Sequence, residues 1–88
     1  KAVCGLDVHK DSVYLCILSE FGELIEKVFG VLTYQLEEMR DLMLHHHVVE
    51  VSMEAPVSTE HLVYKLTILT GGYGSQFEYK LEEESITI

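Results

Sequence analysis

The sequence is poor in basic side chains, with 6 Lys and Arg residues against 15 Asp and Glu residues and a formal net charge of −9. Phosphate contacts supply most of the non-specific affinity for nucleic acids, and they require clustered Lys and Arg. The sequence contains no such cluster, so we expect this chain alone to bind DNA or RNA weakly. It also contains no signal peptide and no apolar run near the ~18 residues that cross a bilayer. We therefore expect a cytoplasmic protein without a membrane partner.

Cysteine and proline are scarce as well. Cys4 and Cys16 have no close His or Cys partners, which excludes a zinc signature. They would lie on neighbouring strands if residues 1–19 form a hairpin, so a disulfide is geometrically conceivable, but two buried thiols in a reducing cytoplasm are the favoured interpretation. The 88 residues make one small domain, 1–88, of ordinary globular composition, able to bury ~60–65% of its unfolded surface. Because the chain begins at Lys1 without a methionine, we expect it to be a fragment of a longer protein.

Three apolar segments with short polar or glycine-containing connections predict an antiparallel meander of strands over residues 2–8, 12–18 and 24–29. The first of them is mostly apolar on both faces, which is typical of a strand buried on both sides. An amphipathic helix is predicted next, over residues 34–46, with Thr33 as its N-cap. Its apolar face is formed by Leu36, Met39, Leu42 and Met43.

A fourth strand is predicted over residues 48–53, stopped by Pro56. Because a strand reached through a helical crossover is usually parallel to its partner, we expect it to run parallel to the first strand. Beyond it, Ser58 or Thr59 can cap a second helix that Gly71-Gly72 would end, although a strand over 64–70 is the alternative. Residues 77–81 alternate as a strand should. These elements predict an α/β fold, a mixed sheet with helices packed on it.

Two carboxylates, Asp7 and Glu54, stand at the ends of the first and fourth apolar runs. A charged group costs several kcal/mol to desolvate unless it is paired or bound to a cation. If the two strands are parallel neighbours, both acids emerge at the carboxyl edge of the sheet, where open α/β sheets place their sites. Such oxygen ligands suit Mg²⁺ or Mn²⁺, and two such ions about 4 Å apart can support phosphodiester cleavage. The alternative is that both acids are solvent-facing turn caps.

The remaining polar motifs favour structural interpretations. His9 and Lys10 could contact phosphate and Asp11 could help to hold a metal, but solvation and turn capping are the simpler roles. His45-His46-His47 resembles a metal-chelating tract, yet adjacent helical residues point in different directions and cannot converge on one ion. Gly71-Gly72-Tyr73-Gly74 lacks the strand, helix and Lys of a phosphate loop.

A family resemblance accompanies these motifs. The run Gly5-Leu6-Asp7-Val8-His9-Lys10-Asp11, the Phe21-Gly22 turn, the Leu36–Leu42 helix and Val51-Ser52-Met53-Glu54 resemble the N-terminal, RuvC-like domain of insertion-sequence transposases with a DEDD acidic set. These transposases are relatives of the Piv-type DNA invertases. The resemblance covers residues 2–54, whereas 55–88 depart from the family pattern and are expected to be a diverged or truncated remainder.

The resemblance implies a ribonuclease-H-like (RuvC-type) fold and a DNA recombinase that mediates transposition of a mobile element. Asp7 and Glu54 would be the first two catalytic and metal-binding acids, with Mg²⁺ or Mn²⁺ as the cofactor of the full-length protein. DNA and, in some members, a guide RNA would be partners of that protein. The family's other two Asp residues have no match in residues 55–88, so we expect this fragment to be inactive alone.

Two other functions stay open from the sequence. A non-catalytic protein-interaction module of the same fold would make the acids incidental, and an exposed edge strand would allow a homodimer by edge pairing. An actin-like ATPase also carries an Asp on its first strand, but it needs a glycine-rich phosphate turn after that strand, and His9-Lys10-Asp11 contains no glycine.

Overall fold

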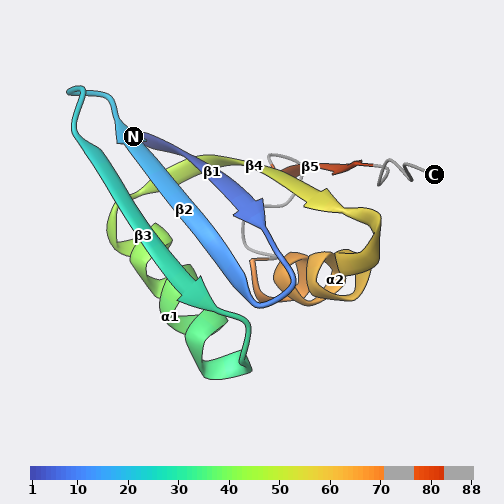
Figure 1. Ribbon diagram of the computed structural model, residues 1–88. Helices are drawn as coiled ribbons and strands as arrows, with labels where there is room; N and C mark the ends of the chain where they lie inside the picture. The colour runs from blue at the N-terminus through green and yellow to red at the C-terminus, as the bar shows by residue number, and fades with distance from the viewer. Residues whose placement is uncertain (71–76, 83–88) are drawn as a thin grey trace.

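The computed structural model describes residues 1–70 and 77–82, which form one mixed sheet with helices on one of its faces (Figure 1). The strand order is β3-β2-β1-β4-β5. β1 is antiparallel to β2 and β2 to β3, whereas β4 is parallel to both β1 and β5. The mixed α/β sheet predicted from the sequence is therefore confirmed. The strands are β1 Ala2–Val8, β2 Ser12–Ser19, β3 Leu24–Gly30, β4 Val48–Pro56 and β5 Phe77–Glu82, and the α-helices are α1 Thr33–His45 and α2 Glu60–Leu69.

Two tight turns build the β1–β2–β3 meander. The backbone N–H of His9 donates to the carbonyl of Ser12 over 2.8 Å and closes the first turn. In the second turn Gly22 has φ +84°, a left-handed conformation that glycine adopts without steric cost. The Ser19 hydroxyl accepts hydrogen bonds from the N–H groups of Phe21 and Glu23 and fixes this turn. The meander is thus closed by local hydrogen bonds that a short polar connection can supply.

The start of α1 differs from the prediction. Leu32, not Thr33, is the N-cap residue, and the helix runs from Thr33 to His45. The side chain of Gln35 folds back, and its Oε1 accepts a hydrogen bond from the N–H of Leu32 over 3.1 Å. Gly30 makes room for it, because a Cβ at that position would overlap the Gln35 amide group. A side chain in the first turn therefore satisfies the N–H of the N-cap residue itself, which is the half of a capping box that the N3 residue supplies.

β4 is longer than predicted, and Glu54 lies inside it. The strand continues through Ala55 to Pro56, and the 3-10 turn Val57–Thr59 leads directly into α2. α2 confirms the predicted second helix, so the alternative strand over 64–70 is wrong. β5, at Phe77–Glu82, confirms the fifth strand. The predicted stop at Gly71-Gly72 lies outside the described residues.

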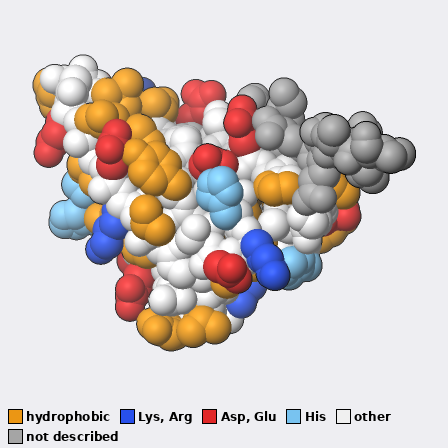
Figure 2. Space-filling model, viewed as in Figure 1, with side chains coloured by type: hydrophobic (Ala, Val, Ile, Leu, Met, Phe, Trp, Pro, Cys, Tyr) orange, Lys and Arg blue, Asp and Glu red, His pale blue; other side chains and the backbone are white. Residues whose placement is uncertain are grey.

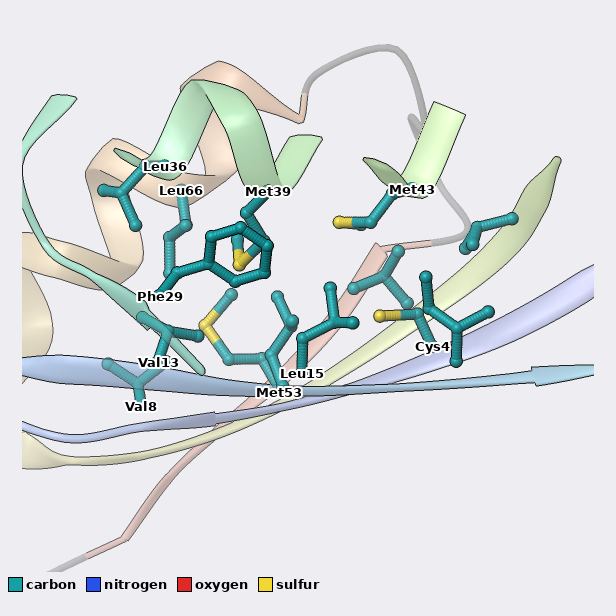
Figure 3. Packing of buried hydrophobic residues seen from close by; sticks show 14 of the residues in the cluster. Cys4, Val8, Val13, Leu15, Phe29, Leu36, Met39, Met43, Met53 and Leu66 are labelled. Carbon is teal, nitrogen blue, oxygen red and sulfur yellow. The ribbon is translucent and has the colours of Figure 1, made fainter. Parts of the chain in front are cut away.

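The core lies between the sheet and the two helices. Figure 3 shows α1 and α2 side chains pointing toward alternate residues of the strands. Leu36, Met39 and Met43 of α1 and Leu66 of α2 are fully buried. They pack against a buried sheet surface that includes Val8, Val13, Leu15, Ile17, Phe29, Val51 and Met53.

The other sheet face has no helix over it in the described part of the chain, and we call it the open face. This corrects the expectation that the first strand is buried on both sides, because burial alternates along β1 and Val3 is 43% exposed. The predicted apolar character of β1 is real, but only its Ala2, Cys4, Leu6 and Val8 face is covered. Among the described residues no helix is long and apolar enough to cross a membrane.

Candidate metal site on the open face of the sheet

Asp7 and Glu54 are direct neighbours across the β1–β4 pair. The two strands run parallel with Asp7 in register with Glu54, so their Cα atoms are partners on adjacent strands. Adjacent strands lie ~4.8 Å apart, and residues in register project to the same side of the sheet. Both residues are exposed, on the open face. The helical crossover through α1 therefore brings together two carboxylates that are far apart in the sequence.

Tyr14 extends this row of side chains onto β2, where it is the antiparallel partner of Asp7. Its hydroxyl donates a hydrogen bond to the Glu26 carboxylate of β3, which raises the pKa of Tyr14 above its ordinary value. The next row across the sheet consists of smaller residues, Cys16, Gly5 and Ser52, which are register partners. The small row lies beside the taller Tyr14–Asp7–Glu54 row.

These two rows enclose an open pocket of about 350 Å³. Gly5 leaves the pocket open at its base, because no heavy atom lies within 4 Å of the position that a Cβ would occupy there. The carboxylates of Asp7 and Glu54 stand at its edge, so a small polar group entering the pocket would meet both. Its lining is formed by Gly5, Leu6, Asp7, Tyr14, Cys16, Ser52 and Glu54.

The His9 imidazole lies beside the Asp7 carboxylate. Its Nε2 lies 3.3 Å from Asp7 Oδ2, and the two side chains are 60% and 57% exposed. A pair this exposed contributes between about 0 and 1 kcal/mol, because water screens it. His9 can therefore swing away from Asp7 at little cost, and it does not block access of a cation to the carboxylate.

The other residues singled out in the sequence do not join this site. Lys10 and Asp11 are exposed in the β1–β2 turn. His45 and His46 contact each other edge to face with ring centroids 5.1 Å apart, and His47 adopts φ 55° just beyond the helix end. Within residues 1–70 and 77–82, no group of three or more His, Cys, Asp or Glu side chains is placed to hold a metal. The histidine run is thus a helix terminus, in agreement with the structural interpretation.

The conceivable Cys4–Cys16 disulfide is excluded by the sheet. Cys4 is the register partner of Ile17, and Cys16 is the partner of Gly5. Because neighbouring positions along a strand point to opposite faces, Cys4 enters the core and Cys16 borders the pocket. Both are free thiols. Burial raises the pKa of Cys4 to about 12, so this thiol is inert at neutral pH.

Asp7 and Glu54 provide part of the ligand set that a hard divalent cation requires. Mg²⁺ and Mn²⁺ prefer carboxylate oxygens, keep several waters and need only one or two protein carboxylates. Asp7 and Glu54 supply two such groups side by side on an exposed face where water can complete the coordination sphere. Sequence reasoning found both acids, but it missed Tyr14 and the row of small residues. The alternation of β2 would have placed Tyr14 beside Asp7 once the hairpin register was known.

Comparison with known proteins identifies the fold. The sequence matches no protein-family model, and no curated protein is significantly similar to it. The Aquifex aeolicus Ppx/GppA phosphatase, type II variant, is a similar solved structure, with a TM-score of 0.61 and 16% identity over 91% of this chain and 35% of that chain. A second structure of the Aquifex aeolicus PPX-GPPA enzyme gives a TM-score of 0.59 and 17% identity, covering 91% of this chain and 36% of that chain.

A nuclease-type neighbour is also similar. The Fowlpox virus resolvase, solved in complex with Holliday junction DNA, has a TM-score of 0.58 and 10% identity over 99% of this chain and 63% of that chain. The chain has a ribonuclease-H-like fold. It spans roughly a third of the length of the Aquifex enzymes and 63% of the resolvase. At these identities the similarity establishes the fold class predicted from the sequence and no shared activity.

Proposed function

We propose that this chain is the N-terminal part of the catalytic domain of a DEDD-type transposase or site-specific recombinase. In this proposal Asp7 and Glu54 are the first two of its metal-binding acids. The observation that carries the proposal is the parallel register of Asp7 with Glu54 on an exposed sheet face. The ribonuclease-H-like fold, shared with a resolvase solved on Holliday junction DNA, supports DNA phosphodiesters as the substrate class.

Each residue has a defined part in this proposal. Asp7 and Glu54 would hold Mg²⁺ or Mn²⁺, which supplies an activated water or stabilises a leaving oxygen in phosphodiester chemistry. Tyr14 forms the wall beside Asp7. Because the family pattern needs four acids and this chain provides two, the fragment is inactive alone. DNA, a guide RNA and homodimer formation are proposed only for the full-length protein.

Manganese titration tests the metal site directly. Substoichiometric Mn²⁺ added to the ¹⁵N-labelled chain should broaden the amide signals around Asp7 and Glu54 together, and excess Mg²⁺ should reverse the effect. Asp7→Asn and Glu54→Gln should each abolish it. Glu50→Gln is the matched control, because Glu50 lies on the same strand and is exposed like Glu54, about 13 Å away along the strand.

The contrary outcomes are equally specific. Broadening confined to His45, His46 and His47, or spread evenly over all acidic residues, would refute a shared site. In the full-length protein, Asp7→Asn should abolish strand cleavage and transfer while leaving DNA binding intact. If the Asp7→Asn protein still transfers strands, the assignment to a DEDD-type catalytic domain is wrong even where Mn²⁺ binds.

A non-catalytic interaction module is the second candidate function. One observation favours it: no third metal-binding side chain joins Asp7 and Glu54 among the described residues. That alternative expects Mn²⁺ to cause no site-specific broadening, so the titration separates the two functions.

A further inference from the structure

The open face has a second feature at the end of the sheet away from Asp7 and Glu54. Four exposed apolar side chains, which we call the apolar band, lie there: Leu24 of β3, Leu18 of β2 and Val3 of β1 are register partners, and Val49 of β4, at the β-bulge, lines the same pocket as Val3 and Leu18. They are 55%, 45%, 43% and 37% exposed. Figure 2 shows hydrophobic side chains gathered over β2 and β3 on the face turned toward the viewer. Isolated exposed apolar residues are common, but a row of register partners across three strands that continues to Val49 around one pocket marks an interaction surface.

The band contains a hollow. A pocket of about 340 Å³ lies between Val3, Leu18 and Val49, and its rim includes Lys1, Ser19 and Glu20. This volume accepts an apolar side chain from outside. The helices cover one side of β1, and the apolar band lies on its other, exposed side.

The charges around the band define what could cover it. Glu50 is the register partner of Val3, and Glu26 follows Leu24 two residues along β3 on the same face. Glu20 lines the pocket, and its Oε1 lies 3.2 Å from the α-amino group of Lys1. Among the described residues that line the pocket, Lys1 is the only basic one. The apolar band is therefore bordered mainly by carboxylates, in a chain whose net charge is −9.

We propose that the apolar band is a docking surface for a basic amphipathic helix of a partner protein. Apolar residues of that helix at i, i+3 or i+4, and i+7 span about 10 Å, and the band crosses about 14 Å of sheet. One anchor side chain enters the pocket, and flanking Lys or Arg residues face Glu20, Glu26 and Glu50. A second copy of this chain would oppose acid to acid, and an anionic membrane would be repelled, so neither matches the rim.

A designed peptide tests this surface with EDTA present, which makes the test independent of the metal site. The probe is a fluorescein-labelled 18-residue helix with Leu on one face and Lys on both flanks; the matched control replaces every Lys by Glu. We expect saturable binding of the Lys peptide, with an affinity at least about tenfold higher than that of the Glu peptide. Raising NaCl from 50 to 300 mM should lower the affinity for the Lys peptide by about tenfold. Chemical shifts of Val3, Leu18 and Val49 should change on binding.

Protein variants locate the binding surface. Leu18→Thr with Leu24→Thr should weaken binding by at least about tenfold, and threonine preserves the strands because it is β-branched. Ile68→Gln is the control, since Ile68 is 79% exposed on α2 in the other layer. Equal affinity for the two peptides, shift changes centred on α2, or unchanged binding by the double variant would each overturn the proposal. So would sedimentation showing a dimer that Leu18→Thr dissociates, because a second copy would then be the occupant.

Discussion

The carboxylates at the candidate site place like charges side by side, which has a measurable cost in the absence of metal. Asp7 and Glu54 are register partners on adjacent strands; the exposed His9 lies beside Asp7, and Lys80 of β5 is the register partner of Glu54 on its other side. Like charges directly across a strand pair destabilise a sheet by a fraction of a kcal/mol. The arrangement is understandable if a cation binds between the two acids.

Glu54→Gln should therefore stabilise the metal-free protein. We expect the free energy of unfolding in urea with EDTA to rise by at most about 0.5 kcal/mol, because the repulsion from Asp7 is removed while loss of the charge opposite Lys80 on β5 offsets part of the gain. With Mn²⁺ the order should reverse, since the unsubstituted chain gains stability from binding and the variant does not. Urea unfolding followed by circular dichroism measures both effects. A variant less stable than the parent in EDTA would show that Glu54 has a structural role.

The two cysteines should differ sharply in reactivity, because they lie on opposite faces of the sheet. One thiol, that of Cys16, should react with Ellman's reagent in the native protein, and two should react in denaturant. Peptide mapping identifies which one reacted. Native reaction of both would contradict the burial of Cys4.

Alkaline pH should destabilise the fold through Cys4. Its pKa is raised from 9.0 to about 12 by burial and, secondarily, by the nearby Cys16. Below pH 9 the thiol is protonated in both states; above it the unfolded chain loses the proton while the folded chain keeps it. Stability should therefore fall as pH rises from about 9 toward about 12, by up to about 1.4 kcal/mol per pH unit. Melting curves of the parent and Cys4→Val between pH 8 and 10.5 measure this, and equal slopes for the two proteins would refute it.

At the scale of elements, local sequence patterns were informative where one periodicity dominated. Apolar segments with short polar connections predicted β1, β2 and β3 to within one residue at each end, and the helical spacing of apolar residues predicted α1 within one residue. The end of β4 was misplaced, because Glu54 interrupts the apolar run while remaining a β-strand residue. The N-cap was misassigned for a similar reason. Threonine is a common N-cap residue, but here Leu32 is the N-cap and the Gln35 side chain accepts a hydrogen bond from its N–H. No rule about position 33 alone predicts this.

The contact between Gly30 and Gln35 predicts a coupled pair at the start of α1. Gly30→Ala would push the Gln35 amide away from the Leu32 N–H, and Gln35→Ala would remove the same hydrogen bond. Each substitution alone should cost about 1 kcal/mol, the usual effect of losing a helix cap. Together they should cost clearly less than the sum, because the second change has nothing left to disrupt. A double-mutant cycle from urea unfolding tests this, and strict additivity would show that the two residues act independently.

For the whole molecule, the position of the candidate acids followed from topology rather than from local sequence. A meander, a helical crossover and a parallel return leave few arrangements, and the commonest one puts the fourth strand beside the first. That rule was enough to predict that Asp7 and Glu54 would meet. It could not reveal the pocket beside them, which depends on the exact register of Cys16, Gly5 and Ser52 across three strands. It also could not show that no second layer covers β1 within the part of the chain that the structure describes.

The charge of the whole chain leads to the last prediction, which concerns DNA. Non-specific binding to a duplex has a Kd of about 10⁻⁴–10⁻⁶ M when phosphates are neutralised by Lys and Arg. This chain carries a net charge of −9, and acids dominate its open face. We therefore expect no saturation by a labelled 20-base-pair duplex or four-way junction at 100 μM protein and 150 mM salt, measured by fluorescence anisotropy. Mn²⁺ should increase binding modestly in the parent and not in Asp7→Asn, because a bound cation offsets charge only where both acids remain. Micromolar affinity without metal would mean that a recognition surface exists on this chain that its charge distribution does not predict.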